Sequence, residues 1–254
     1  MALPPFGGAR LNPGSPFLPL CYPRIFIPPW RQVINLRTFQ ATGLLRDTPT
    51  TLLPGSGMDT VRFLFSALPS EGPFTFVMVA RLIGDKGVRE YVAAAAQVAR
   101  RRPDVRFLLI GPQGVSNSSA ILPEEVERWR EEGVIAYLGE QDDVRPFIAE
   151  SHELVLPSYR EGMPRTVLEA ASMGRPAIVT DVPGCRQAVV NGETGWLCEV
   201  KSAESLAACM EDCLALPPET LAAAGQAARR RIEAEFDERL VVRAALDCLE
   251  GARS

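Results

Sequence analysis

The spacing of apolar residues changes its period repeatedly along the chain. Residues 75–80 (TFVMVA) form an uninterrupted apolar run, which is typical of a strand buried on both faces of a parallel sheet. Apolar side chains then recur at intervals of three and four residues from Val88 to Ala99, which predicts an amphipathic helix that ends before Pro103. A strand followed by such a helix is the unit from which parallel sheets with covering helices are built.

The same unit recurs downstream, and shorter elements precede it. A helix is expected at 36–45 and a strand at 50–53; further strands are expected at 106–110, 134–138, 154–156, 177–180 and 196–200, with helices at 123–132, 144–150, 164–173 and 185–190. Three helices, at 203–216, 218–235 and 238–249, complete the pattern. The sequence therefore predicts an α/β protein with a doubly wound, parallel, Rossmann-like sheet and a C-terminal helical segment. Its ligand should bind at the carboxyl ends of the strands.

The first 34 residues do not share this pattern. They contain eight of the 22 prolines and no acidic residue, and their apolar residues follow neither a period of 2 nor one of 3.6. We expect residues 1–34 to be an irregular, Pro-rich segment, aberrant or disordered, ahead of a domain at 35–254.

Charge and composition exclude several classes of protein. The net charge of −4, from 27 Lys and Arg against 31 Asp and Glu, argues against a nucleic-acid partner. No apolar run approaches the length of a membrane span, so we expect a cytoplasmic protein. The six cysteines include no CxxC pair, and the single histidine, His152, is far from all of them in sequence, so no metal site is expected.

Cationic residues and glycines follow the first buried strand, just before a predicted helix. The segment Arg81-Leu-Ile-Gly-Asp-Lys86-Gly87 puts a guanidinium and an ammonium at this position. A helix N-terminus attracts anions, and charge-assisted hydrogen bonds stabilise by roughly 1.5–3 kcal/mol each. Arg81 and Lys86 are therefore candidates to bind a diphosphate without a metal ion; the alternative is a solvated loop with incidental charges.

Two glutamates follow the strand expected at 154–156. Glu161 lies in the next loop, and Glu169 lies on the second turn of the helix expected at 164–173. Carboxylates accept paired hydrogen bonds from sugar hydroxyls, and their charge stabilises an oxocarbenium-like centre. Each glutamate also has an ordinary explanation: Glu161 as a solvated loop acid, and Glu169 as an acid that the helix dipole favours.

Taken together, these segments resemble the donor-binding, C-terminal half of retaining glycosyltransferases of the family 4 type (group 1), which have the GT-B fold. The resemblance covers about residues 35–250. It is carried by the Arg81 to Lys86 pair, by residues 161–170 with their two glutamates, and by residues 173–184 (MGRPAIVTDVPG). The loops at 54–59 and 192–195 also match. Residues 157–190 are most similar to bacterial enzymes that extend surface polysaccharides or lipid-linked oligosaccharides.

The resemblance implies a role for each matching residue. Arg81 and Lys86 would bind the diphosphate of a UDP- or GDP-sugar and stabilise it as it leaves, with Glu161 beside the donor sugar as the third catalytic residue. Glu169 would bind the ribose hydroxyls. The other residues implied in donor binding are Gly57, Gly162, Met163 and Pro164, together with Thr166 and Val167 through their amides. No cofactor or metal is implied. The acceptor would be a glycan or a polyprenyl-diphosphate-linked sugar, which places the protein in the cytoplasm at the inner face of the cell membrane.

The chain also departs from the family, because the half that binds the acceptor has no counterpart before residue 35. One hypothesis is a reading frame that starts wrongly or downstream of a disruption, leaving a truncated and inactive fragment. Three functions stay open: a glycosyltransferase, a non-catalytic nucleotide-sugar-binding subunit that pairs with a separate acceptor-domain chain, and a sugar-nucleotide epimerase of similar architecture.

Overall fold

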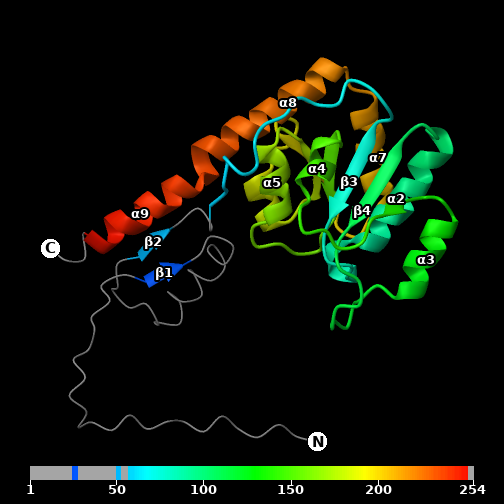
Figure 1. Ribbon diagram of the computed structural model, residues 1–254, viewed down its shortest axis with the longest axis horizontal. Helices are drawn as coiled ribbons and strands as arrows, with labels where there is room; N and C mark the ends of the chain where they lie inside the picture. Colours follow the sequence, from blue (N-terminus) through cyan, green and yellow to red (C-terminus); the bar gives the residue numbers. More distant parts are fainter. Residues whose placement is uncertain (1–24, 28–49, 53–56, 251–254) are drawn as a thin grey trace, which may run out of the picture.

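In the computed structural model, residues 25–27, 50–52 and 57–250 are described, and most of them build one parallel sheet with helices on both sides (Figure 1). Its six strands are β3 (Thr75–Val79), β4 (Arg106–Ile110), β5 (Ala136–Tyr137), β6 (Glu153–Leu156), β7 (Ala177–Thr180) and β8 (Gly195–Cys198). Their order is β5-β4-β3-β6-β7-β8, and every pair is parallel. The structure thus confirms the predicted doubly wound sheet.

Helices alternate with these strands. They are α2 (Val88–Arg101), α3 (Pro123–Glu131), α4 (Arg145–Ala149), α5 (Arg165–Ser172) and α6 (Pro183–Ala188), followed by α7 (Ala203–Leu214), α8 (Pro218–Arg231) and α9 (Glu238–Glu250). α2 packs against α7, and α5 packs against α8. The run from α8 to α9 forms a long rod, and α9 extends beyond the sheet (Figure 1). None of the described helices is long and apolar enough to cross a membrane.

The strand order reverses direction between β3 and β6. The chain builds β3, β4 and β5 toward one edge, and then returns to place β6 on the other side of β3. In doubly wound sheets a crevice opens at such a switch point, at the carboxyl ends of the two strands. The loops that leave β3 and β6 carry Lys86 and Glu161, so the topology makes neighbours of two segments that lie 75 residues apart.

The core lies around the central strands of the sheet, whose sequences are the continuous apolar runs noted above. Every residue of β3, β6 and β7 is buried. Tyr91 of α2 is fully buried, and its hydroxyl donates to the carbonyls of Phe76 and Leu108 at 3.3 and 3.0 Å. Such a bond is required, because a buried hydroxyl without a partner is costly. It ties α2 to β3 and β4.

Two arginines hold the segment 57–67 against the sheet domain. Arg175 is completely buried and donates six hydrogen bonds of 2.7–3.1 Å, five of them to backbone carbonyls, which include those of Ser66 and Ala67. Burial lowers the pKa of Arg175 to about 10. Arg229 of α8 donates to the carbonyls of Thr60 and Phe63. These bonds make the segment part of the sheet domain.

The same segment meets the start of α9. Met58 exchanges backbone hydrogen bonds with the chain around Asp237: its amide donates to Phe236 and its carbonyl accepts from Glu238. The buried Asp237 carboxylate accepts from the Thr60 hydroxyl and, with both oxygens, from Nε and Nη2 of Arg239. Two passages of the chain, 57–60 and 236–239, are therefore joined side by side.

Several element boundaries differ from those expected. The ladder keeps only two residues of β5, since Leu108 and Leu109 pair with Ala136 and Tyr137 alone. The helix expected at 218–235 changes at Ile232 into a wider π-helical turn, Ile232–Phe236. α6 begins two residues early, at Pro183, because proline suits the first turn of a helix.

The N-terminal expectations fall largely outside the described residues, which include neither the helix expected at 36–45 nor most of 1–34. Within the segment expected to be irregular, Ile25–Ile27 forms a strand, β1. It pairs in parallel with β2 (Thr50–Leu52) in a separate two-stranded sheet.

Candidate functional site

The loops that follow β3 and β6 are in direct contact. Gly87, the residue before α2, has a left-handed φ of +73°, and a Cβ placed on it would lie 2.1 Å from the carbonyl oxygen of Pro157. Only glycine allows this approach. Two residues before Gly87 and two residues after Pro157, the carbonyl of Asp85 accepts from the amide of Tyr159 at 2.9 Å. The backbone thus joins the segment that carries Lys86 to the segment that carries Glu161.

Lys86 and Glu161 form an ion pair across this junction, with the ammonium donating to Oε1 of the carboxylate. Lys86 ends a short 3-10 turn, Gly84–Lys86, and its side chain is 23% exposed; that of Glu161 is 10% exposed. An ammonium has three donors and a carboxylate has two acceptor oxygens, so both groups keep capacity for a further ligand. The sequence prediction that these residues share one site is consistent with this contact.

Helix α6 packs against the backbone of the Glu161 loop. A Cβ on Gly184 would lie 2.5 Å from the carbonyl oxygen of Glu161 and 2.3 Å from that of Gly162, so the helix touches the loop backbone. Thr180, at the end of β7, donates its hydroxyl to the carbonyl of Ser158. The Cys185 thiol is fully buried, and burial followed by the nearby Glu161 charge raises its pKa to about 12. This thiol is therefore a neutral packing group.

Helix α5 follows the Glu161 loop and carries Glu169. Pro164 is its N-cap residue, with φ −75° and ψ 100°, rather than its first helical residue as expected. Glu169 is 9% exposed, and burial raises the pKa of its carboxyl, while the hydrogen bond from Arg165 Nε to Oε1, at 3.1 Å, opposes that rise. Glu169 is thus a partly desolvated acid stabilised by a cation from its own helix.

The backbone amides in the first turn of α5 differ in whether they already donate a hydrogen bond. The Val167 amide already donates to the carbonyl of Pro164 at 3.1 Å, so a phosphate would have to share or replace that bond. No protein acceptor for the Thr166 amide is found in the part of the chain that the structure describes. A free amide at a helix N-terminus is suited to an anion.

Four other predicted residues have distinct surroundings. Arg81 follows β3 and is exposed, and within residues 57–250 its guanidinium makes no ion pair. Met163 is half-buried and packs on the core beside Gly162, which is also half-buried. Gly57, expected in donor binding, lies against α9: its φ is +81°, and a Cβ there would be 2.4 Å from Cα of Glu238. The crossing of two chain segments explains that glycine without any ligand.

Sequence reasoning missed the group that fixes the Glu161 loop from the side of α2. The Tyr159 hydroxyl donates to Oε1 of Glu90 at 2.6 Å, and the ammonium of Lys201 lies 4.8 Å from the tyrosine ring centre. Burial, followed by the hydrogen bond to Glu90, raises the pKa of Tyr159 to about 12. Tyr159 therefore stays protonated and holds the loop; a tyrosine two residues before a candidate catalytic acid was the only available signal.

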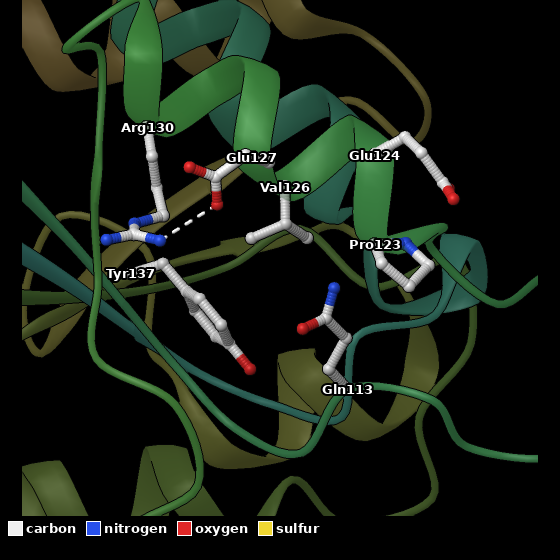
Figure 2. Close-up of a pocket in the computed structure, with 7 residues that line it drawn as sticks. All are labelled: Gln113, Pro123, Glu124, Val126, Glu127, Arg130 and Tyr137. Carbon is white, nitrogen blue, oxygen red and sulfur yellow. Dashed lines mark hydrogen bonds and ion pairs between the residues drawn. The ribbon is translucent and has the colours of Figure 1, made fainter.

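A separate cavity of about 310 Å³ opens between α3 and the carboxyl ends of β4 and β5 (Figure 2). Its lining includes Gln113, Tyr137 and the Glu127 to Arg130 ion pair, which Figure 2 shows on the α3 side. No predicted site residue lines it, since those follow β3 and β6. Within the described residues, no group of three or more His, Cys, Asp or Glu side chains is arranged to hold a metal ion.

A doubly wound sheet with a lysine and a glutamate paired at its switch point belongs to the α/β proteins that bind ligands at the carboxyl ends of their strands. The family model "Glycosyl transferases group 1" matches residues 73–215, which include every strand of the six-stranded sheet. The chain belongs to this family.

Relatives with similar sequences support this family assignment. The chain is 30% identical over 192 residues to a glycogen synthase of Mycobacterium tuberculosis, a match that covers 74% of this chain and 45% of the relative. It is 32% identical over 130 residues to the N,N'-diacetylbacillosaminyl-diphospho-undecaprenol alpha-1,3-N-acetylgalactosaminyltransferase of Campylobacter jejuni, covering 51% of this chain and 32% of that one. The chain thus spans less than half the length of these relatives.

Solved structures share the fold. Sucrose-phosphate synthase from Thermosynechococcus elongatus superposes with a TM-score of 0.72 at 22% identity, over 91% of this chain and 59% of that one. HepE of Anabaena in complex with UDP gives a TM-score of 0.72 at 22% identity, over 84% and 60% of the two chains. These likenesses confirm the expected architecture, the Rossmann-like half of a GT-B fold.

Proposed function

We propose that this chain is the donor-binding half of a glycosyltransferase that transfers a sugar from a UDP- or GDP-sugar to a glycan or lipid-linked acceptor with retention at the anomeric carbon. The observation that carries the proposal is the junction of Lys86 and Glu161 at the switch point of the sheet. Support comes from relatives named as polysaccharide biosynthesis glycosyltransferases and from a structural neighbour in complex with UDP.

In this proposal the diphosphate lies between Lys86 and the N-terminus of α5. The bond between the anomeric carbon and the diphosphate oxygen breaks, and its electron pair stays on that oxygen as negative charge. The acceptor hydroxyl oxygen forms the new bond to the anomeric carbon, and its proton passes to the departing diphosphate. The ammonium of Lys86 and the exposed guanidinium of Arg81 stabilise the departing charge, as does the Thr166 amide. No metal ion or cofactor is required for that stabilisation.

The carboxylate of Glu161 has a second role in the proposal. It forms an ion pair with Lys86, and it lies in the loop just before Gly162 and Met163, which would line the sugar pocket. A negative charge beside the anomeric carbon favours an oxocarbenium-like transition state. Glu161 would therefore contribute more to transfer than to nucleotide binding.

The acceptor-binding half is also a matter of proposal. The chain matches less than half the length of its named relatives, so we infer that transfer needs an acceptor-binding half supplied by a longer form of the protein or by a separate chain. Alone, the chain would bind the nucleotide sugar and act as a donor-binding subunit. We place it in the cytoplasm, at the inner face of the membrane that holds a lipid-linked acceptor.

Calorimetric titration with UDP, GDP and their sugars tests donor binding. Lys86→Met should weaken nucleotide binding about 10–100-fold, because it removes one or two charge-assisted hydrogen bonds. Glu161→Gln should leave UDP affinity within a few-fold and lower sugar transfer far more. Glu219→Gln, which changes an exposed carboxylate on α8, is the matched control. Nucleotide affinity unchanged in Lys86→Met would contradict the proposal.

A transfer assay with radiolabelled donor and lipid-linked acceptors, with and without an added acceptor-domain chain, separates a subunit from a complete enzyme. An epimerase of similar architecture would instead invert a centre of the sugar without any acceptor, which nuclear magnetic resonance of the donor would detect.

A further inference from the structure

Arg165 has a position that helix stability does not explain. It is the first residue of α5, where the positive end of the helix dipole disfavours a cation. Its partner, Glu169, lies four residues later, and a cation placed before its acid is the weaker order for such a pair. The guanidinium is also 61% exposed, whereas the Glu169 side chain is 12% exposed. An exposed cation is thus paired with a largely desolvated acid.

The contact involves only one of the two carboxylate oxygens. Arg165 Nε donates to Oε1 of Glu169 at 3.1 Å, and within the described residues no side chain or backbone group donates to Oε2. Oε2 is not among the buried side-chain atoms that lack a partner, and the Glu169 side chain is 12% exposed. A carboxylate held in this way is fixed in orientation and still has an open acceptor for hydroxyl groups.

We propose that Arg165 is a positioning residue, which holds Oε1 of Glu169 and leaves Oε2 to accept the ribose hydroxyls of the nucleotide donor. This inference rests on the proposed function, in which Glu169 binds the ribose. A neutral carboxyl would accept more weakly, and a carboxylate free to rotate would lose entropy on binding. Arg165 removes both disadvantages before the donor arrives.

One other charged group acts on the Glu169 carboxyl, Arg62 from the segment 57–67. Burial alone would favour the neutral acid, and the two arginines oppose it. With Arg165 removed, Arg62 alone opposes burial, so Glu169 becomes protonated at a higher pH. A merely structural role for Arg165 would not change how ligand affinity depends on pH.

The test compares binding of UDP and 2′-deoxy-UDP, and of GDP and 2′-deoxy-GDP, to the full 254-residue chain by calorimetry between pH 5 and 8. In Arg165→Gln we expect about tenfold weaker binding of the ribonucleotide, a smaller preference over the deoxy form, and a loss of affinity that begins at higher pH than in the wild type. Arg165→Lys should recover part of the affinity. Arg128→Gln is the control, because Arg128 is equally exposed at 61% and pairs with Glu132 in the same i,i+4 geometry.

Unchanged ribonucleotide affinity and preference in a folded Arg165→Gln would overturn the inference, as would full loss in Arg165→Lys that matches Arg165→Gln. These results differ from failure of the proposed function, in which the wild type binds neither UDP nor GDP. If the wild type binds and Glu169→Gln abolishes the preference for ribose while Arg165→Gln keeps it, the site stands and only the role of Arg165 is wrong. Circular dichroism of each variant establishes that it is folded.

Discussion

Replacing Gly87 with alanine should separate the two loops that carry Lys86 and Glu161. The new Cβ would lie 2.1 Å from the Pro157 carbonyl oxygen, whereas a carbon and an oxygen in contact are about 3.3 Å apart, so one loop must move by about 1 Å. The left-handed backbone adds about 1–2 kcal/mol, and the overlap adds about 1–3 kcal/mol. We therefore expect Gly87→Ala to lower the free energy of unfolding by about 2–5 kcal/mol.

The matched control is Gly133→Ala. Gly133 has nearly the same φ, +68°, but its added Cβ would meet nothing within 4 Å. It should lose only the backbone contribution, about 1–2 kcal/mol. The difference between the two variants in urea denaturation isolates the contact between the loops. A displacement of about 1 Å at a site can lower its activity about a hundredfold, so Gly87→Ala should also bind UDP much more weakly. Equal losses of stability in the two variants, with equal UDP binding, would refute this reasoning.

Three further predictions concern buried charges. Glu153 is fully buried, and desolvation raises the pKa of its carboxyl well above the usual range. The stability that this group contributes is therefore present below about pH 4.5 and is lost as pH rises. Glu153→Gln should raise the Tm at pH 7 and not at pH 4, and a lower Tm at pH 7 would contradict this. Asp237 has the opposite shift, because the hydrogen bonds from Arg239 lower the pKa of its carboxyl. Its contribution to stability is therefore present above about pH 4 and is lost at lower pH. Thermal melts of Asp237→Asn should show a lower Tm than the wild type at pH 7, and this difference should shrink toward pH 2. Arg175→Met should lower the free energy of unfolding in urea by about 3–5 kcal/mol, since it leaves buried carbonyls without donors, and a loss below about 1 kcal/mol would show that water replaces the guanidinium.

Periodicity predicted the fold well because buried parallel strands have continuous apolar sequences. Strands β3, β4 and β7 match their expected ranges to within one residue. β6 also matches to within one residue; it begins at Glu153, one residue early, because a fully buried acid gives no apolar signal. The prediction missed the π-helical turn at Ile232–Phe236 and the pairing of Met58 with Asp237, a contact across 179 residues that no local pattern encodes.

The candidate site was likewise predicted only in part from the sequence. The spacing of Glu161 and Glu169 and the cation at Lys86 were visible as motifs, and the structure brings Lys86 and Glu161 into contact. Gly57 was visible as a glycine but not as the neighbour of Glu238, because a sequence records that a glycine is present and not which backbone it touches. The Tyr159 to Glu90 bond and the single-oxygen contact of Arg165 with Glu169 depend on side-chain directions that only coordinates supply.

The arginine bonds to residues 60–67 determine where this protein can be cut or recombined. The family match begins at residue 73, yet a gene product started there would leave Arg175 with a buried charge and too few acceptors, and Arg229 would lose the carbonyls of Thr60 and Phe63. A chimera that joins this domain to another one should therefore place its junction before residue 57. With the junction there, the sheet domain would keep the segment 57–67 that its arginines bind, and it could be joined to a different acceptor-binding domain without redesign of its interior.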